Sequence, residues 1–71
     1  MGENEKALNA CKMALESDPD HLDSLLRGGD LLCEFDDYGE AFKCYVRALK
    51  LSPGNVAAKQ GKELCELKIN E

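Results

Sequence analysis

The chain lacks the two long segments that would direct it to or across a membrane. No run of about 18 apolar residues occurs in its 71 residues, so no membrane-spanning helix is expected. No basic N-terminal stretch leads into an apolar segment, so no secretory signal peptide is visible. The length indicates one small domain or a part of a larger protein. The expected location is cytoplasmic, because the four cysteines show no disulfide pattern.

Positive charge is also scarce. Nine basic residues face 14 acidic ones, which gives a net charge of −5. Proteins that bind nucleic acid present a basic stripe to the phosphate backbone. The charge balance therefore excludes nucleic acid as an expected partner and favours a protein or peptide with basic or apolar residues.

The four cysteines show no Cys-x-x-Cys spacing, and the segments between them look helical rather than rich in turns. We therefore expect reduced thiols and no metal site. Cys11 and Cys65 fall on apolar helix positions and are predicted to be buried, whereas Cys33 and Cys44 are predicted to be more exposed. A redox or metal-binding role for these cysteines is kept as an alternative function.

No set of residues suggests catalysis. The single histidine, His21, stands in a turn without catalytic partners, and no Ser/His/Asp or Cys/His arrangement is apparent. Gly28 and Gly29 fall inside a helical pattern, so they are not a phosphate-binding loop. We expect neither enzymatic activity nor a cofactor.

A repeat with a period of 34 is the strongest pattern in the sequence. "ALNACKMALESDPD", which begins at residue 7, and "AFKCYVRALKLSPG", which begins at residue 41, are identical at four of 14 positions. The identical pairs are Ala7 and Ala41, Ala14 and Ala48, Leu15 and Leu49, and Pro19 and Pro53. Small residues at helical spacing are expected to let a neighbouring helix come close, so all four alanines are predicted to face one.

The apolar periodicity predicts helices near residues 4–17, 22–34, 38–51 and 55–69. Gly28 and Gly29 each cost the second helix about 1 kcal/mol relative to alanine, which is tolerated where a neighbour must approach closely. Asp36 and Asp37 are expected to form a turn and to cap the third helix. Tyr45 is expected to fill the space between Ala41 and Ala48, and Ala48→Leu to overpack it by about 1–3 kcal/mol.

Residues 22–55 resemble one tetratricopeptide repeat (TPR). The resemblance lies in Leu25, Gly28, Gly29 and Leu32 of the first helix and in Ala41, Tyr45, Ala48 and Pro53 of the second. Leu25 stands where the family has a tryptophan, and Gly28 where it has a leucine. Residues 3–20 resemble the second helix of a preceding repeat, and residues 56–71 resemble the helix that caps such arrays. The implied fold is all-α, with about four helices in antiparallel hairpins that stack as a short α-solenoid over a single domain, residues 1–71.

The resemblance implies a scaffold that binds a peptide in a concave groove, as in co-chaperones or assembly factors. Acidic residues with apolar positions between them would suit a basic and apolar peptide. Asp30 would repel the acidic tails that one subfamily binds. A solvated face without a specific contact is the alternative for these charges. The predicted groove residues are Asp23, Leu26, Arg27, Asp30, Cys33, Glu34, Gln60, Leu64 and Leu67.

Self-association is the remaining alternative. The helix at residues 4–17 matches the second half of a repeat whose first helix is not in this sequence. Leu8, Cys11 and Leu15 would then lack a partner helix, and a second copy of the chain could cover them.

Overall fold

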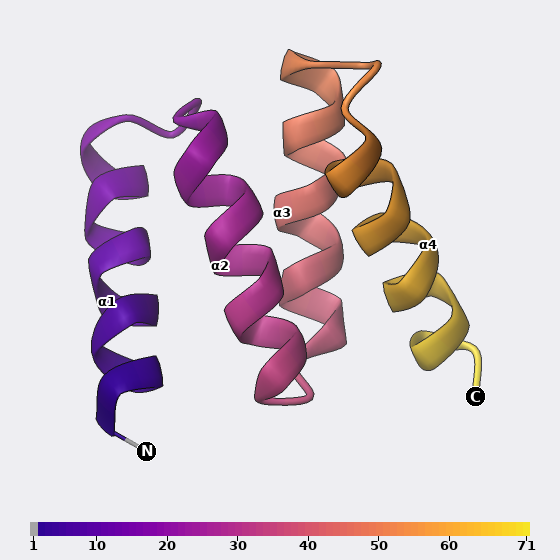
Figure 1. Ribbon diagram of the computed structural model, residues 1–71, viewed down its shortest axis with the longest axis horizontal. Helices are drawn as coiled ribbons and strands as arrows, with labels where there is room; N and C mark the ends of the chain where they lie inside the picture. The colour runs from indigo at the N-terminus through magenta and orange to yellow at the C-terminus, as the bar shows by residue number, and fades with distance from the viewer. Residues whose placement is uncertain (1) are drawn as a thin grey trace.

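The computed structural model describes residues 2–71 and folds them into four α-helices joined by short turns (Figure 1). The all-α prediction is confirmed, and the helix bounds agree with it to within two residues. Met1, the first residue of the predicted domain, lies outside the described residues. Within residues 2–71, no helix is both long enough and apolar enough to cross a membrane. The helices are α1 (Gly2–Ser17), α2 (Leu22–Glu34), α3 (Tyr38–Leu51) and α4 (Val56–Ile69).

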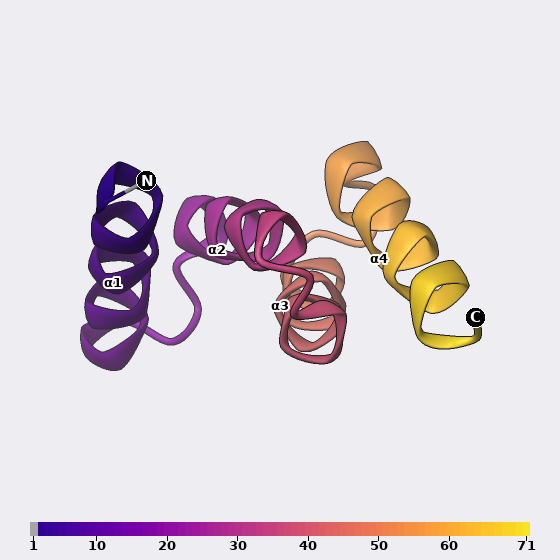
Figure 2. The same ribbon diagram turned by 90° about the horizontal axis from the view of Figure 1, so that it is seen from below.

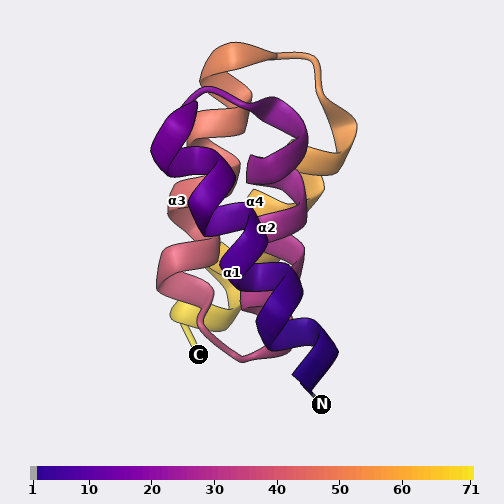
Figure 3. The ribbon, with the colours of Figure 1, turned by 90° about the vertical axis from the view of Figure 1, so that its left-hand side faces the viewer.

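Successive helices run antiparallel and lie side by side, and their bounds repeat along the chain. The ends of α1 and α3 are one repeat length apart, and so are the starts of α2 and α4. Viewed from below, α3 lies between α2 and α4 (Figure 2) and packs against both, while α2 also meets α4. Viewed from its own side, α1 lies in front of the others (Figure 3), and it contacts only α2 among the described helices.

The turns begin two helices with side-chain caps. The His21 Nδ1 atom accepts a hydrogen bond from the Ser24 amide at 3.1 Å, and Asn55 Oδ1 accepts one from the Ala58 amide at 3.0 Å. Each bond satisfies an amide that the first helical turn leaves without a partner. The sequence pattern predicted His21 only as a turn residue, but it is the N-cap residue of α2.

The turn before α3 differs from its prediction. Asp36 has a φ of 60°, so the predicted turn is confirmed. The predicted side-chain cap is wrong, because Asp37 precedes α3 with φ −92° and ψ 66° and its side chain accepts no capping bond. These angles lie outside the extended region that N-cap residues adopt. The Asp36 carboxylate instead accepts a hydrogen bond from the Tyr38 hydroxyl at 3.1 Å.

The core forms where α3 meets its two neighbours. Ala41 and Ala48 are fully buried, and Tyr45 between them is 2% exposed, as predicted. A Cβ atom on Gly29 would lie 2.7 Å from Tyr45 Cζ, and one on Gly61 would lie closer still. Since such approaches are sterically forbidden, the Tyr45 ring fits only because glycines of α2 and α4 stand on either side of it.

The two glycines of α2 do not have the same role. Close approach at Gly29 is confirmed, although the nearest atoms belong to the Tyr45 ring rather than to a backbone. At Gly28 the prediction is wrong, because an added Cβ would lie 3.8 Å from Cys11 Cβ and 4.0 Å from Cys44 Sγ. Those are ordinary van der Waals distances, so the contact between α1 and α2 leaves room for a methyl group.

The predicted contact of Ala7 is also wrong. Ala7 is exposed and Ala14 is half-buried, whereas their repeat equivalents, Ala41 and Ala48, are fully buried. The reason is the number of neighbours: α3 is covered by α2 and α4, but α1 packs against α2 alone within residues 2–71. The same small side chain therefore ends in solvent where no second helix covers it.

Candidate functional site

The predicted groove residues of α2 recur at intervals of three and four residues, which places them on one side of the helix. Asp23, Arg27, Asp30 and Glu34 are exposed, while Leu26 and Cys33 are half-buried. Three carboxylates and one guanidinium make this side of α2 acidic. Arg27 lies 3.9 Å from Asp23 in an exposed ion pair, a type that contributes little to stability.

The predicted groove residues of α4 follow those of α2 at the repeat distance. Gln60, Leu64 and Leu67 are the repeat equivalents of Leu26, Asp30 and Cys33, respectively. Leu64 is 44% exposed and Leu67 is 69% exposed. Two large aliphatic side chains thus stand in solvent at positions equivalent to those that are acidic or thiol-bearing on α2.

Asp30 connects this acidic side to the core. Its carboxylate accepts a hydrogen bond from the hydroxyl of Tyr45, the ring enclosed between α2 and α4. Burial, followed by this hydrogen bond to a carboxylate, raises the pKa of Tyr45 far above its usual value. Asp30 is therefore both an exposed residue of the predicted groove and the partner of a buried phenol.

Glu34, at the end of α2, accepts a hydrogen bond from the side-chain amide of Asn4 at 2.9 Å. The bond joins the start of α1 to the end of α2 across 30 residues of sequence. Both side chains are exposed, so it is a surface contact that water can replace.

Two thiols meet between α2 and α4. The Cys33 and Cys65 Sγ atoms are 3.7 Å apart, and all four cysteines are free. The predicted burial of Cys11 and Cys65 is confirmed at 8% and 0% exposure. Burial, and then the hydrogen bond with Cys33, raises the pKa of Cys65 to about 12. Sequence reasoning missed this pair, although the two positions lie only slightly less than one repeat length apart.

Metal coordination has no geometric basis in the described part of the chain. No group of three or more His, Cys, Asp or Glu side chains in residues 2–71 is arranged to hold an ion. His21 uses its Nδ1 atom to cap α2, and the Cys33–Cys65 pair lacks further ligands nearby.

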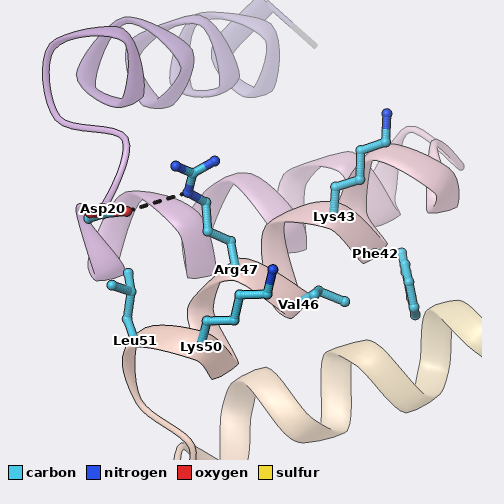
Figure 4. A pocket seen from close by; sticks show the side chains of 7 residues that line it. All are labelled: Asp20, Phe42, Lys43, Val46, Arg47, Lys50 and Leu51. Atoms are coloured by element: carbon cyan, nitrogen blue, oxygen red, sulfur yellow. Dashed lines mark hydrogen bonds and ion pairs between the residues drawn. The ribbon is translucent and has the colours of Figure 1, made fainter.

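A second surface, which the sequence reasoning missed, lies on the outward side of α3. A depression of about 520 Å³ runs along this helix and reaches Asp20 in the connection between α1 and α2 (Figure 4). Lys43, Arg47 and Lys50 contribute its positive charges. Their spacing of four and three residues was a visible signal, but Asp20 is distant in sequence and gave none.

A search of the sequence against models of known protein families finds no matching family.

Proposed function

We propose that this chain is a protein-interaction module of the TPR type, which binds a basic and apolar peptide of a partner along α2 and α4. In this proposal the hairpins are part of a short α-solenoid, and the chain has no catalytic activity of its own. The offset of one repeat length between the ends of α1 and α3, and between the starts of α2 and α4, supports the assignment. The sequence resemblance at Leu25, Gly29, Ala41, Tyr45 and Ala48 supports it further.

One observation carries the binding proposal: Leu64 and Leu67 are left 44% and 69% exposed on α4, which packs against α2 and its acidic side chains. Exposed aliphatic side chains next to a row of carboxylates suit a ligand that alternates basic and apolar residues. The Asp23 carboxylate would attract the basic residues, while Leu64 and Leu67 would cover the apolar ones.

We place the module in a co-chaperone or assembly factor of the cytoplasm. The four free thiols support this, since two of them are 3.7 Å apart and would be exposed to oxidation in a secretory compartment. The class of protein rests on the resemblance alone.

A peptide titration tests the proposal. The probe is a fluorescent peptide of alternating Lys and Leu, and anisotropy follows its binding to the wild type and to Asp23→Lys/Glu34→Lys. We expect the double variant to bind about tenfold more weakly, because it replaces attraction by repulsion. Asp30 is left intact because its substitution would also remove the partner of the Tyr45 hydroxyl.

Glu3→Lys/Glu5→Lys is the matched control, since it changes the net charge equally on exposed positions of α1. Equal losses in both double variants would show that only total charge matters and would contradict a groove on α2. Leu64→Ala/Leu67→Ala should also weaken binding, and wild-type affinity there would remove α4 from the site. Size-exclusion chromatography at the working concentrations checks that self-association does not cause the signal.

The 3.7 Å approach of Cys33 and Cys65 favours a second candidate, a reversible disulfide between α2 and α4. In this reaction the Cys33 thiolate attacks glutathione disulfide and releases one glutathione thiolate. The Cys65 sulfur, after losing its proton, then displaces the second, so two protein thiols are oxidised and one glutathione disulfide is reduced. The raised pKa of Cys65 makes the second step slow at neutral pH.

Mass spectrometry after incubation with glutathione disulfide decides this candidate. The expected product is an intramolecular Cys33–Cys65 disulfide that Cys65→Ala cannot form, with Cys44→Ala as the control that still forms it. Only mixed disulfides with glutathione, or no reaction under native conditions, would rule the switch out.

A further inference from the structure

The outward side of α3 is basic in an otherwise acidic chain. Lys43, Arg47 and Lys50 lie on one side of this helix at intervals of four and three residues, and Glu40 is the only acidic residue of α3. The whole chain carries a net charge of −5. α4 also carries three lysines, but two glutamates accompany them, so the bases of α3 form the less neutralised group. They belong to a different surface from the acidic side of α2.

Apolar side chains accompany these bases along the depression. Phe42 and Val46 are half-buried in it, and Leu51 at its end is 42% exposed. Figure 4 shows the Phe42 ring lying toward α4, while Arg47 reaches Asp20. At about 1.5 Å per residue, the cations form a row of about 10 Å along α3. Phe42 and Val46, one helical turn apart, form a shorter apolar row on one side of it, while Leu51, at the end of the helix, lies on the other side of the cations.

We propose that this depression, defined by Phe42, Lys43, Val46, Arg47, Lys50 and Leu51, is a second docking surface and that it binds an acidic amphipathic peptide segment of a partner protein. The charge pattern selects the ligand, since a helix with Asp or Glu on one side and Leu or Phe on the next would match both rows. The volume of about 520 Å³ is enough for several such side chains.

The bases of α3 are available to a ligand. Lys50 has no ion pair among residues 2–71, and Lys43 contacts only Glu40, at 3.6 Å, with both side chains more than half exposed. The Arg47 guanidinium lies 3.5 Å from Asp20, again in solvent. Exposed pairs of this kind exchange readily for a ligand carboxylate, because they are weak. Arg47 differs in that its pair ties α3 to the connection between α1 and α2.

The two surfaces would therefore take ligands of opposite charge on one small domain. The proposed groove on α2 and α4 would take a basic segment, and the α3 depression an acidic one. This inference does not depend on the groove, because its residues lie on another side of the chain and its probe has the opposite sign.

A titration with a designed peptide tests the inference. The probe is a fluorescent helical peptide of about 12 residues, with Glu and Leu placed to match the two rows, and binding is followed by anisotropy. We expect saturable binding that Lys43→Glu/Lys50→Glu weakens about tenfold or more and that added salt also weakens. Arg47 is kept, so that its pair with Asp20 is preserved, and circular dichroism confirms folding of the variant.

Two controls test whether binding depends on the position of the charges and on the order of residues in the peptide. Lys6→Glu/Lys12→Glu makes the same charge change on exposed positions of α1 and should keep most of the affinity. A scrambled peptide of the same composition should bind markedly less well. Equal binding of both peptides, equal losses in both double variants, or no saturation up to about 1 mM peptide would each overturn the proposal.

A further experiment shows whether the α3 surface binds a partner peptide or a second copy of this chain. If analytical ultracentrifugation without peptide shows wild-type self-association that Lys43→Glu/Lys50→Glu abolishes, the surface binds a second copy of this chain. The proposed peptide partner is then wrong. Asp23→Lys/Glu34→Lys should leave binding of the acidic probe at wild-type strength or stronger, and a loss there would also contradict a separate site.

Discussion

The helices α1 and α3 share one sequence pattern but differ in their surroundings. Ala41 and Ala48 of α3 are fully buried, whereas Ala7 of α1 is exposed and Ala14 is half-buried. Tyr45 of α3 is enclosed between two glycines, while its repeat equivalent in α1, Cys11, is a much smaller residue that is 8% exposed. The same spacing thus produces a packed helix in one case and a half-covered one in the other.

The small residues of the repeat allow close helix packing, but packing occurs only where a neighbouring helix lies against them. α3 has α2 on one side and α4 on the other, but α1 meets only α2 among the described helices. Small residues give close helix packing only where a second surface reaches them, because buried area rather than residue type supplies the energy.

Tyr45→Ala should have the largest effect on this contrast. Removing a buried aromatic ring is expected to lower the free energy of unfolding by about 3–5 kcal/mol, since it deletes the contact with both α2 and α4. Cys11→Ala should cost only about 1 kcal/mol, because a single sulfur is lost. Urea denaturation followed by circular dichroism measures both, and equal losses would contradict the enclosed position of α3.

Leucine at the matched alanines is the next test. Ala41→Leu should destabilise the protein by about 1–3 kcal/mol through overpacking, as Ala48→Leu should. Ala7→Leu should change stability by no more than about 0.5 kcal/mol, because its site faces solvent. Thermal melts of the three variants would refute the comparison if Ala7→Leu proved as damaging as Ala41→Leu.

The adjacent glycines of α2 test its contacts with α1 and α3 separately, because Gly28 lies near Cys11 and Gly29 near Tyr45. Gly29→Ala should destabilise by about 1–3 kcal/mol, because the new Cβ would meet the Tyr45 ring at 2.7 Å. Gly28→Ala should stabilise by up to about 1 kcal/mol, because alanine favours the helix and finds room beside Cys11. Chemical denaturation should therefore show opposite signs, and two losses of equal size would show that α1 packs as tightly as α3.

Alkaline pH should have the smallest effect. The pKa of Tyr45 is raised above its ordinary value of 10.0, so the unfolded chain loses this proton first as the pH rises. The stabilising contribution is therefore complete below about pH 10 and declines above it. Denaturation midpoints should fall less steeply with pH in Tyr45→Phe than in the wild type. Parallel declines would assign the effect to other groups, such as Cys44 and Cys65, whose pKa values are also raised.

Most of the fold could be predicted from the sequence, because the apolar spacing is regular in α2 and α3 and the repeat of 34 residues relates α1 to α3. The burial of Ala41, Tyr45 and Ala48 followed from the same pattern. The exposure of Ala7 could not be predicted in this way, since it depends on which helix reaches α1. The side-chain bond of His21 was also missed, because histidine is an uncommon N-cap and capping depends on backbone angles.

The candidate site was less predictable than the fold. The repeat distance placed the residues of α2 and α4 on equivalent positions, but it could not reveal that Asp30 accepts the Tyr45 hydroxyl. Nor could the repeat distance predict that Arg47 would contact Asp20, which lies 27 residues earlier in the sequence. Such contacts depend on how helices cross, which residue spacing within one helix does not determine.

The bond between Tyr45 and Asp30 gives the protein an optical reporter of its own. The chain contains no tryptophan and only two tyrosines, so Tyr38 and Tyr45 dominate its ultraviolet emission. A carboxylate that accepts the phenol proton in a hydrogen bond quenches tyrosine emission. A ligand that draws Asp30 away from Tyr45 would therefore increase this emission, and binding to the proposed groove could be followed without an attached dye.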